Sequence, residues 1–581
     1  LPLLISSLTT ILAFLPLMLA ENTSGEFLAS LTQVVILALM ASWLLAVSLT
    51  PALCSWFLPN PPPGSHDESK PTGAAYSVYE AALRAILRLR LPFITLAFAA
   101  VFGALILMGQ VKQRNMPPSE RSQFTIYLNL PAGTDISETL EVSGRLAAFL
   151  SDPESNPEIE ANAVYVASGG PRFFLALQPP DPQPHIAFAV VNIQEYAQLG
   201  TVMQRIENFM ARELPEARGR CETLFLGQSP IGTVETRITG QDIQTLQVLA
   251  AEVMEAYRSV PGVIGVRSDW ENPVLTVRVE LDQELTARAG LSSQDIARTL
   301  STLLEGYTVS DYREGENVIP IVIRSTPGRS TSLDELRSLE FYSAETGTPV
   351  PLTQIASLRG VIEPSQIRRL DQERTMTVAG KHVTLGSGEL FKALAPRLEA
   401  INPPAGFALG PAGEIAEAAE SQAELFKYAP HCLLGILALL IFQFNSFRKP
   451  LLVMATIPLI LIGAVLGLLV FGAHFEFPAL LGIFSLAGII INNSIVMIDR
   501  IDQERTAGAG VREAAISAAM IRARPIIITT FTTVVGLVPL ALFGGEFWYA
   551  MSIVIICGLA LGTLQTLFFA PAAYTLLYPD S

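Results

Sequence analysis

The sequence of 581 residues is poor in charge and in cysteine, and each shortage excludes a class of protein. Only 16% of the residues are charged while 50% are hydrophobic, and the mean hydropathy is +0.42, a balance that soluble domains do not reach. The four cysteines stand far apart, so no disulfide framework is predicted. The net charge is −15 and no basic stripe occurs, which argues against a nucleic-acid-binding protein.

Motifs for enzymatic or metal chemistry are also missing. The five histidines are scattered, and none has a Cys, His or carboxylate partner at metal-ligand spacing. No GxxxxGK[ST] phosphate loop and no nucleophile–base motif is found. We therefore expect no enzyme, no cofactor, no bound metal and no direct use of ATP.

What the sequence has instead is long apolar runs. Eight stretches carry no Asp, Glu, Lys or Arg, and each reaches the roughly 17–25 residues that a helix needs to cross a bilayer. The runs predict eight transmembrane helices: Pro2–Ala20, Phe27–Leu58, Leu91–Gln110, Tyr428–Phe447, Pro450–Phe475, Phe477–Ile498, Pro525–Gly545 and Phe547–Tyr578.

The charges between the runs predict the orientation. The loops 59–90, 448–449 and 499–524 hold eleven Lys and Arg, whereas the short loops 21–26, 476 and 546 hold none. Positive loops remain in the cytoplasm. The long segment 111–427 is therefore expected in the periplasm of a bacterium, with the helices in its inner membrane.

An internal repeat links the start of the sequence to its last third. Pro2 and Pro16 stand 14 residues apart, as Pro525 and Pro539 do, with paired threonines at matching positions. Transporter folds often contain such repeats. Since 433 residues separate Pro92 from Pro525, we expect a similar length upstream of Pro2 and an intact protein of about a thousand residues with twelve helices. The sequence is thus interpreted as an N-terminally truncated fragment.

The segment 111–427 has the pattern of repeated βαβ units. Strand-like alternation at Phe124–Leu130 is followed by a helical pattern, and similar units recur up to Gly410. The residues 270–362 interrupt the series and are interpreted as an insertion. The predicted fold class is a polytopic α-helical membrane protein with a large periplasmic α+β domain of ferredoxin-like βαβ units.

One loop of this domain differs from the others. It combines Gly169 and Gly170 with Phe173 and Phe174, and leads through a proline-rich stretch to Phe188. Such a loop can line a mobile apolar cleft for a ligand. The alternative is a turn whose phenylalanines cap a small core.

Several motifs together resemble one family. The stretches Gln443–Pro450, Ile457–Leu459, Ser485–Asp499 and Arg524–Pro525, with Leu130–Thr134 and Val260–Val263, look like the C-terminal half of the resistance-nodulation-division (RND) efflux permeases. The resemblance covers the whole sequence and favours the hydrophobe/amphiphile (acriflavine-resistance type) branch. It implies a homotrimer or heterotrimer in the lipid bilayer, with a periplasmic adaptor (membrane fusion) protein and an outer-membrane channel as partners.

The resemblance also implies the domain organisation. The loop at 168–175 aligns with the substrate-gating loop of the family. The expected parts are a transmembrane hairpin (1–58, family helices 5 and 6), a cytoplasmic linker with an interfacial helix on the inner leaflet (59–90), helix 7 (91–110), porter subdomain 1 (111–221), porter subdomain 2 (222–269 with 363–415), a docking-like insertion (270–362), helices 8–10 (416–498), a cytoplasmic loop (499–524) and helices 11–12 (525–578).

The proton chemistry departs from the pattern of the family. Drug-efflux members couple aspartates on the fourth helix to a lysine on the tenth, and that position is Asn492 here, flanked by Asn493. An asparagine offers hydrogen bonds without the charge that would lower a carboxyl pKa. We expect these amides to hold the fourth-helix aspartates, although they can equally be interhelical contacts. The resemblance assigns further relay positions to Thr529, Thr530, Thr532, Thr533 and Arg524.

The leading functional hypothesis is proton-driven export of amphiphilic small molecules. Alternatives are metal-ion efflux by the same fold, a protein-export member of the superfamily, or a non-transporting sensor or assembly subunit. Metal efflux would favour converging methionines in the outer domain, but Met116, Met203, Met210, Met254 and Met376 show no relay spacing.

Overall fold

The computed structural model describes residues 2–21, 23–58, 73–174, 176–227, 230–323, 333–343 and 345–578. The chain divides into two compact units. The first comprises Leu1–Leu130, Ile136–Asp269 and Arg368–Ser581, and the second comprises Pro131–Asp135 and Trp270–Ile367. The first unit holds a helical bundle and two α/β sheets, and the second is a small α+β module.

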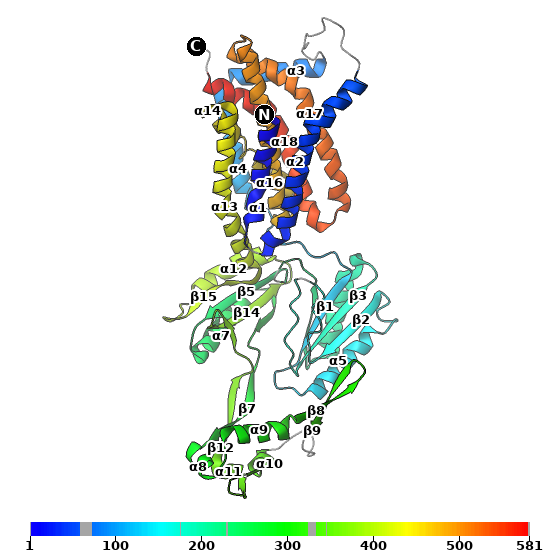
Figure 1. The fold of residues 1–581 in the computed structure, drawn as a ribbon, viewed down its shortest axis with the longest axis vertical. Coiled ribbons are helices and arrows are strands. Elements are labelled where there is room, and N and C mark those ends of the chain that lie inside the picture. The colour runs from blue at the N-terminus through cyan, green and yellow to red at the C-terminus, as the bar shows by residue number, and fades with distance from the viewer. Residues whose placement is uncertain are drawn as a thin grey trace. The chain divides into compact units, whose positions relative to one another are not determined.

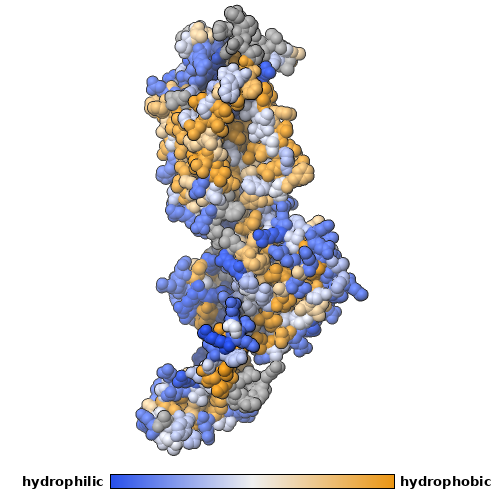
Figure 2. Space-filling model, turned by 45° about the vertical axis from the view of Figure 1, so that its right-hand side comes forward, coloured by the Kyte–Doolittle hydropathy of each residue, from blue (hydrophilic) through white to orange (hydrophobic). Residues whose placement is uncertain are grey.

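The apolar runs form the bundle (Figure 1). Within the described residues, seven helices are long and apolar enough to span a membrane. Hydrophobic side chains cover much of the outer surface of the bundle, as lipid contact requires (Figure 2). The bundle consists of α1 (Pro2–Leu19), α2 (Thr23–Phe57), α4 (Arg90–Met108), α13 (Gly413–Phe444), α14 (Arg448–Met454), α15 (Ile460–Val470), α16 (Phe477–Thr506), α17 (Val511–Phe543) and α18 (Glu546–Leu577).

The run Pro450–Phe475 is not one unbroken helix. This run is divided between α14 and α15, because Pro458 lacks the backbone N–H that an α-helix needs. The chain between them turns more tightly: the Thr456 N–H donates to the Val453 carbonyl at 3.0 Å, and the Ile457 N–H to the Met454 carbonyl at 3.1 Å. The fifth run is therefore two short helices joined by a turn.

The prediction of a loop at 499–524 is wrong. Helix α16 continues to Thr506 and α17 starts at Val511, so only four residues separate them. The extension of α16 is supported by an ion pair one turn apart, Arg500 to Glu504 at 2.8 Å. Buried apolar residues of α17 recur at the helical spacing i, i+3, i+4, i+7 and i+8, at Val511, Ala514, Ala515, Ala518 and Ala519, a pattern that the prediction of a loop left out.

Helix α3 (Ala74–Arg88) is amphipathic, as expected, but its apolar face is buried in protein. Leu83 and Leu87 are 0% and 3% exposed and pack in the core shared by α17 and α18. The Tyr79 hydroxyl donates to the Leu567 carbonyl at 3.0 Å. The apolar face of α3 thus packs against α17 and α18 of the bundle.

Both sheets of the first unit have the predicted ferredoxin-like topology. One has the strand order β2-β3-β1-β4, and in the other β6, β14, β5 and β15 are neighbours in the same pattern, with β13 added at an edge of β14. The first is built from β1 (Gln123–Asn129), α5 (Ile136–Leu150), β2 (Ile159–Val166), β3 (Ile186–Ile193), the 3₁₀ turn Tyr196–Gln198, α6 (Leu199–Glu213) and β4 (Arg218–Thr223). The second is built from β5 (Thr233–Thr239), α7 (Ile243–Arg258), β6 (Val263–Ser268), β13 (Arg368–Leu370), β14 (Glu373–His382), α12 (Ser387–Glu399) and β15 (Ala408–Ala412).

The second unit interrupts the second sheet between β6 and β13. Its core is small and contains Ile296, Phe341 and Leu352. The hairpin β8–β9 is exposed along its whole length. The unit comprises β7 (Pro273–Leu281), α8 (Gln283–Arg288), α9 (Ser293–Leu304), β8 (Tyr307–Glu314), β9 (Asn317–Ile323), α10 (Leu333–Arg337), β10 (Glu340–Tyr342), β11 (Pro349–Pro351), α11 (Leu352–Ile355) and β12 (Ala356–Pro364).

Candidate functional site

Glycines hold α16 and α15 close to α18. A Cβ atom on Gly463 would lie 2.7 Å from both the Cys557 carbonyl oxygen and the Gly558 Cα, which are backbone atoms. A Cβ on Gly558 would lie 2.1 Å from a methyl carbon of Leu486 on α16. Small residues permit such close approach of membrane helices. The glycines therefore fix the position of α16, which carries the two asparagines.

The two asparagines occupy different environments on α16. Asn493 is 8% exposed, and its Nδ2 has no hydrogen-bond partner within the described chain. Asn492 is half-buried. The next residue, Ser494, is fully buried and shares a hydrogen bond of 3.2 Å with the Thr456 hydroxyl, at the turn between α14 and α15. An amide donor that is buried without a hydrogen-bond partner costs free energy.

The threonines of α17 mostly bond to their own helix. Thr529 donates to the Pro525 carbonyl at 2.9 Å, and Thr532 and Thr533 both donate to the Thr529 carbonyl. Only Thr530 reaches another helix, through a hydroxyl contact of 2.6 Å with Thr563 of α18.

The relay positions lie on two helices that pack together, α16 and α17. No hydrogen bond joins the asparagines to the threonines in the described part of the chain. Thr529, Thr532 and Arg524 are exposed in this chain.

A second polar cluster lies at the other end of α16. The segment that leaves α4 is bound by backbone hydrogen bonds to the residues that precede α16. The Arg114 N–H donates to the Phe475 carbonyl at 3.1 Å, the Phe475 N–H to the Lys112 carbonyl at 2.8 Å, and the Phe477 N–H to the Asn115 carbonyl at 3.1 Å. We call residues 112–120 the connector, because they lead from α4 to β1 of the first sheet.

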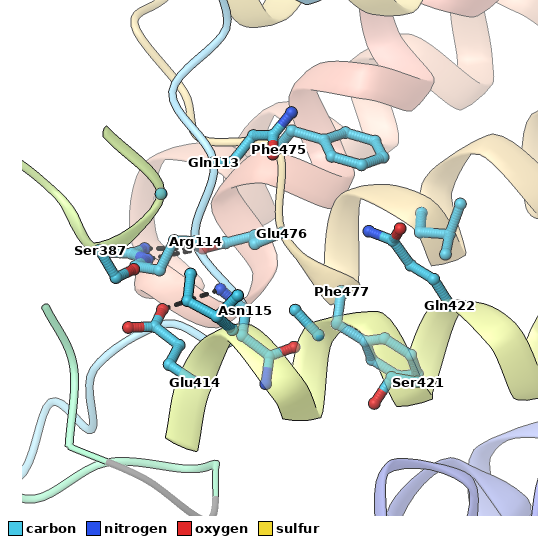
Figure 3. Close-up of a pocket in the computed structure, with 14 residues that line it drawn as sticks. Gln113, Arg114, Asn115, Ser387, Glu414, Ser421, Gln422, Phe475, Glu476 and Phe477 are labelled. Atoms are coloured by element: carbon cyan, nitrogen blue, oxygen red, sulfur yellow. Dashed lines mark hydrogen bonds and ion pairs between the residues drawn. The ribbon is translucent and has the colours of Figure 1, made fainter. Parts of the chain in front are cut away.

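Arg114 of the connector points toward the carboxylate of Glu476 (Figure 3) and also contacts that of Glu546. Arg114 donates from Nε and Nη2 to Glu476 Oε2 at 2.9 and 2.8 Å, and its Nη2 is 3.3 Å from Glu546 Oε2. The Glu476 side chain is 1% exposed, whereas that of Glu546 is 47% exposed. Arg114 thus bridges the N-terminal ends of α16 and α18.

A cavity of about 80 Å³ adjoins this ion pair. Glu414, at the start of α13, lines it and is 4% exposed. Its carboxylate accepts from the backbone N–H groups of Asn115 and Gly232, both at 3.1 Å. The remaining lining is mixed, with Gln113, Ser387, Ser421 and Gln422 among the polar groups and Phe475 and Phe477 among the apolar ones.

Burial governs the protonation of Glu476. Desolvation raises the pKa of this carboxyl to about 7, although Arg114 opposes the rise, and Glu546 adds to it. His474 does not supply a compensating charge, since burial and the nearby Arg114 and Lys112 lower its pKa. Glu476 therefore changes its charge near neutral pH.

The sequence analysis did not select this cluster, although a signal was present. Glu476 and Glu546 are the single charged residues that separate two pairs of long apolar runs. A lone carboxylate in place of a polar loop is unusual at a membrane boundary. The partner Arg114 could not be assigned, because it lies 362 residues earlier in the chain.

The glycine-rich loop lies on the first sheet, with Leu175 outside the described residues. Phe188 belongs to β3 and is 1% exposed in a small aromatic core with Tyr127. Gly170 has φ 68°, and a Cβ there would lie 2.8 Å from the Tyr165 ring.

The two phenylalanines of the loop differ in exposure. Phe173 is 37% exposed, and Phe174 is half-buried with the Arg121 guanidinium 5.0 Å from its ring centre. Gly169 packs on Pro180. The structure thus places Gly170, Phe174 and Phe188 in one aromatic region, in which Phe188 is a core residue. Phe173 is exposed, and Gly169 contacts Pro180 instead.

The chain combines apolar helices, two ferredoxin-like sheets and an inserted module, and known proteins share this arrangement. The sequence matches the AcrB/AcrD/AcrF family over residues 1–578. The chain belongs to this family of RND efflux permeases. The prediction of the family is confirmed, and transport rather than enzymatic activity is the family's role.

Relatives of two kinds are found. The chain is 24% identical over 604 residues to the cobalt-zinc-cadmium resistance protein CzcA of Cupriavidus metallidurans, covering 99% of this chain and 55% of that protein. It is 23% identical over 599 residues to the multidrug resistance protein MdtC of Pantoea ananatis, covering 98% and 56%. The chain thus spans about half the length of these relatives.

The solved structures that resemble the chain support the fold. A heavy metal efflux pump superposes with a TM-score of 0.75 at 20% identity, covering 99% of this chain and 58% of that one. A second crystal form of a heavy metal efflux pump gives the same TM-score at 22% identity. At this identity the likeness establishes the RND permease fold and leaves the substrate class open.

Proposed function

We propose that this chain is part of the inner-membrane permease of a tripartite efflux pump that exports amphiphilic small molecules in exchange for protons. The observation that carries the proposal is the buried, unpaired amide of Asn493 beside the half-buried Asn492, in a helix tightly packed in an RND bundle. A buried polar group inside a membrane is costly unless it is hydrogen-bonded, and such groups often mark functional sites. In our proposal these amides face carboxylates that lie in a part of the protein beyond this chain.

The proposal places the α/β sheets in the periplasm. The positive charges at the opposite end of the bundle support this orientation. In the assembled pump, the two sheets serve as porter subdomains and the second unit serves as a docking domain. The permease forms a trimer that works with a periplasmic adaptor and an outer-membrane channel.

An aromatic region supports amphiphiles as the substrate class. Phe174, Tyr127 and Tyr165 cluster at the glycine-rich loop, Arg121 adds a cation beside the Phe174 ring, and Phe173 of the same loop is exposed. Aromatic and apolar linings with few polar groups suit amphiphilic ligands.

Metal-ion efflux is the second candidate, because CzcA and the nickel and cobalt resistance protein CnrA are among the relatives. In the described residues, however, no group of three or more His, Cys, Asp or Glu converges on a common point. We therefore propose amphiphiles first.

A growth and efflux panel separates the two substrate classes. Cells that express the full native gene, in a host without its own RND pumps, are loaded with a lipophilic cationic dye or with Zn²⁺ or Co²⁺. We expect faster dye efflux, sensitivity of that efflux to a protonophore, and no change in metal tolerance. Phe173→Ala should slow dye efflux several-fold because the exposed ring contributes apolar contact area, whereas the remote Val78→Ala should not. Metal tolerance without dye efflux would overturn the amphiphile assignment.

A further inference from the structure

The buried Glu476–Arg114 pair joins three parts of the molecule. Glu476 is the residue immediately before α16, Arg114 belongs to the connector that leads to β1, and Glu546 begins α18. The connector is also held at Glu120, which accepts a hydrogen bond of 2.6 Å from the Glu546 N–H. Any motion of α16 along its axis must therefore either carry the connector with it or break these bonds.

Glu476 lies on the same helix as the asparagines. Asn492 lies sixteen positions after Glu476, which corresponds to roughly 24 Å at 1.5 Å per residue. A helix is stiff over this length, so a displacement at one end is transmitted to the other. The cluster is thus mechanically linked to the polar residues inside the bundle.

We infer that Glu476 is a protonation switch that controls whether the connector is closed on α16 or open. In the closed arrangement the carboxyl is buried against Arg114, and in the open arrangement it is hydrated. The inference goes beyond the proposed transport, because it concerns a site outside the membrane-spanning helices and requires no knowledge of the substrate.

The direction of the switch follows from proton linkage. The pKa of Glu476 is about 7 when it is buried and falls toward its ordinary value of 4.5 when water reaches it. Protons bind more tightly to the state with the higher pKa, so acid stabilises the closed connector and loss of the proton favours the open one. The stabilisation is present below the lower value and is lost as the pH rises through about 7.

The ion pair with Arg114 does not reverse this direction. Taking a carboxylate out of water costs more here than one arginine returns, as is common for buried pairs. The other charged groups around Glu476 are Lys112, Glu120, Glu414, His474 and Glu546. Of these, Glu546 disfavours a second negative charge, and it offers Arg114 an alternative partner when Glu476 is neutral.

The adjoining cavity leaves room for water beside the carboxyl. Its volume of about 80 Å³ is enough for a few water molecules, and Glu476 is one of its lining residues. Polar groups of Gln113, Ser387, Ser421 and Gln422 lie along the same wall. Under the orientation proposed above, this cavity lies on the periplasmic side.

Amide hydrogen exchange on the full-length protein tests the switch. The reporters are the N–H groups of Arg114, Phe475 and Phe477, which bond across the connector. After correction for intrinsic exchange, we expect opening to increase on the order of tenfold between pH 5.5 and pH 8, with a midpoint near 7. The Glu476→Gln variant, a mimic of the protonated state, should stay protected at both pH values.

Two further variants keep the test decisive. Glu546→Gln removes the exposed carboxylate and should keep the pH dependence, with its midpoint shifted slightly downward. Arg114→Met removes the group that lowers the pKa, so its midpoint should move upward. A flat profile in the native protein, or an unchanged profile in Glu476→Gln, would overturn the inference. Because exchange requires neither substrate nor a proton gradient, this result is independent of whether the transport proposal holds.

Discussion

Replacing Gly463 by alanine is expected to destabilise the helical bundle by about 3 kcal/mol. The added Cβ would lie 2.7 Å from the Cys557 carbonyl oxygen and 2.7 Å from the Gly558 Cα, so α15 and α18 must move apart. No flexible side chain can yield at this point, because both contacts are backbone atoms. The measurement is the midpoint of thermal unfolding in detergent, followed by loss of the monodisperse peak in size-exclusion chromatography.

The matched control is Gly103→Ala in α4. A Cβ on Gly103 meets no atom within 4 Å, so the same chemical change lacks the clash. We expect an unchanged or slightly higher midpoint, since alanine favours the helix over glycine by up to about 1 kcal/mol. Equal midpoints for the two variants would show that the close approach of α15 and α18 does not determine stability.

Replacing Asn492 or Asn493 by leucine is expected to abolish proton-coupled transport without unfolding the protein. In our proposal each amide donates a hydrogen bond to a carboxylate. A hydrogen bond to a charged group contributes about 1.5–3 kcal/mol, which is a factor of roughly ten or more in the equilibrium between the conformations that it couples. The Asn493 Nδ2 has no partner in the described chain, so its loss removes no hydrogen bond donated by this atom there.

Measuring both the transport activity and the unfolding midpoint of these variants shows whether the asparagines couple protons or only pack helices together. If the asparagines merely connect packed helices, both variants should lower the unfolding midpoint, and transport by the remaining folded protein should persist. Ser494→Ala is the control for packing, because Ser494 has a partner within the chain, the Thr456 hydroxyl at 3.2 Å. It should lower stability modestly and leave the proton dependence of efflux intact.

Two sequence patterns made the fold predictable: long uncharged runs indicated the helices, and alternation of apolar and polar residues indicated the strands. The long uncharged runs became the bundle helices, and the strand pattern of 111–427 became two ferredoxin-like sheets. The differences have local causes. Pro458 divides one run into α14 and α15. The charges of the segment 499–524 predict a loop, although Val511, Ala514 and Ala518 already show the apolar spacing of a helix.

The candidate site was only partly predictable. The asparagines and threonines could be selected because polar residues are rare within apolar runs. The contact between Arg114 and Glu476 could not, because it joins residues 362 positions apart and depends on tertiary packing. The sequence also could not show whether Phe188 lies in the core or lines a cleft. An alternating strand pattern does not reveal what covers each face of the sheet.

Direct measurement of proton movement tests the central claim that this chain belongs to a proton-driven exporter. The full-length protein is reconstituted into proteoliposomes with a pH-sensitive dye, and an amphiphile that the efflux panel identified is added. We predict that transport of the amphiphile is accompanied by proton flux in the opposite direction, and that Asn492→Leu eliminates both. Transport of the amphiphile without any proton flux would contradict the account.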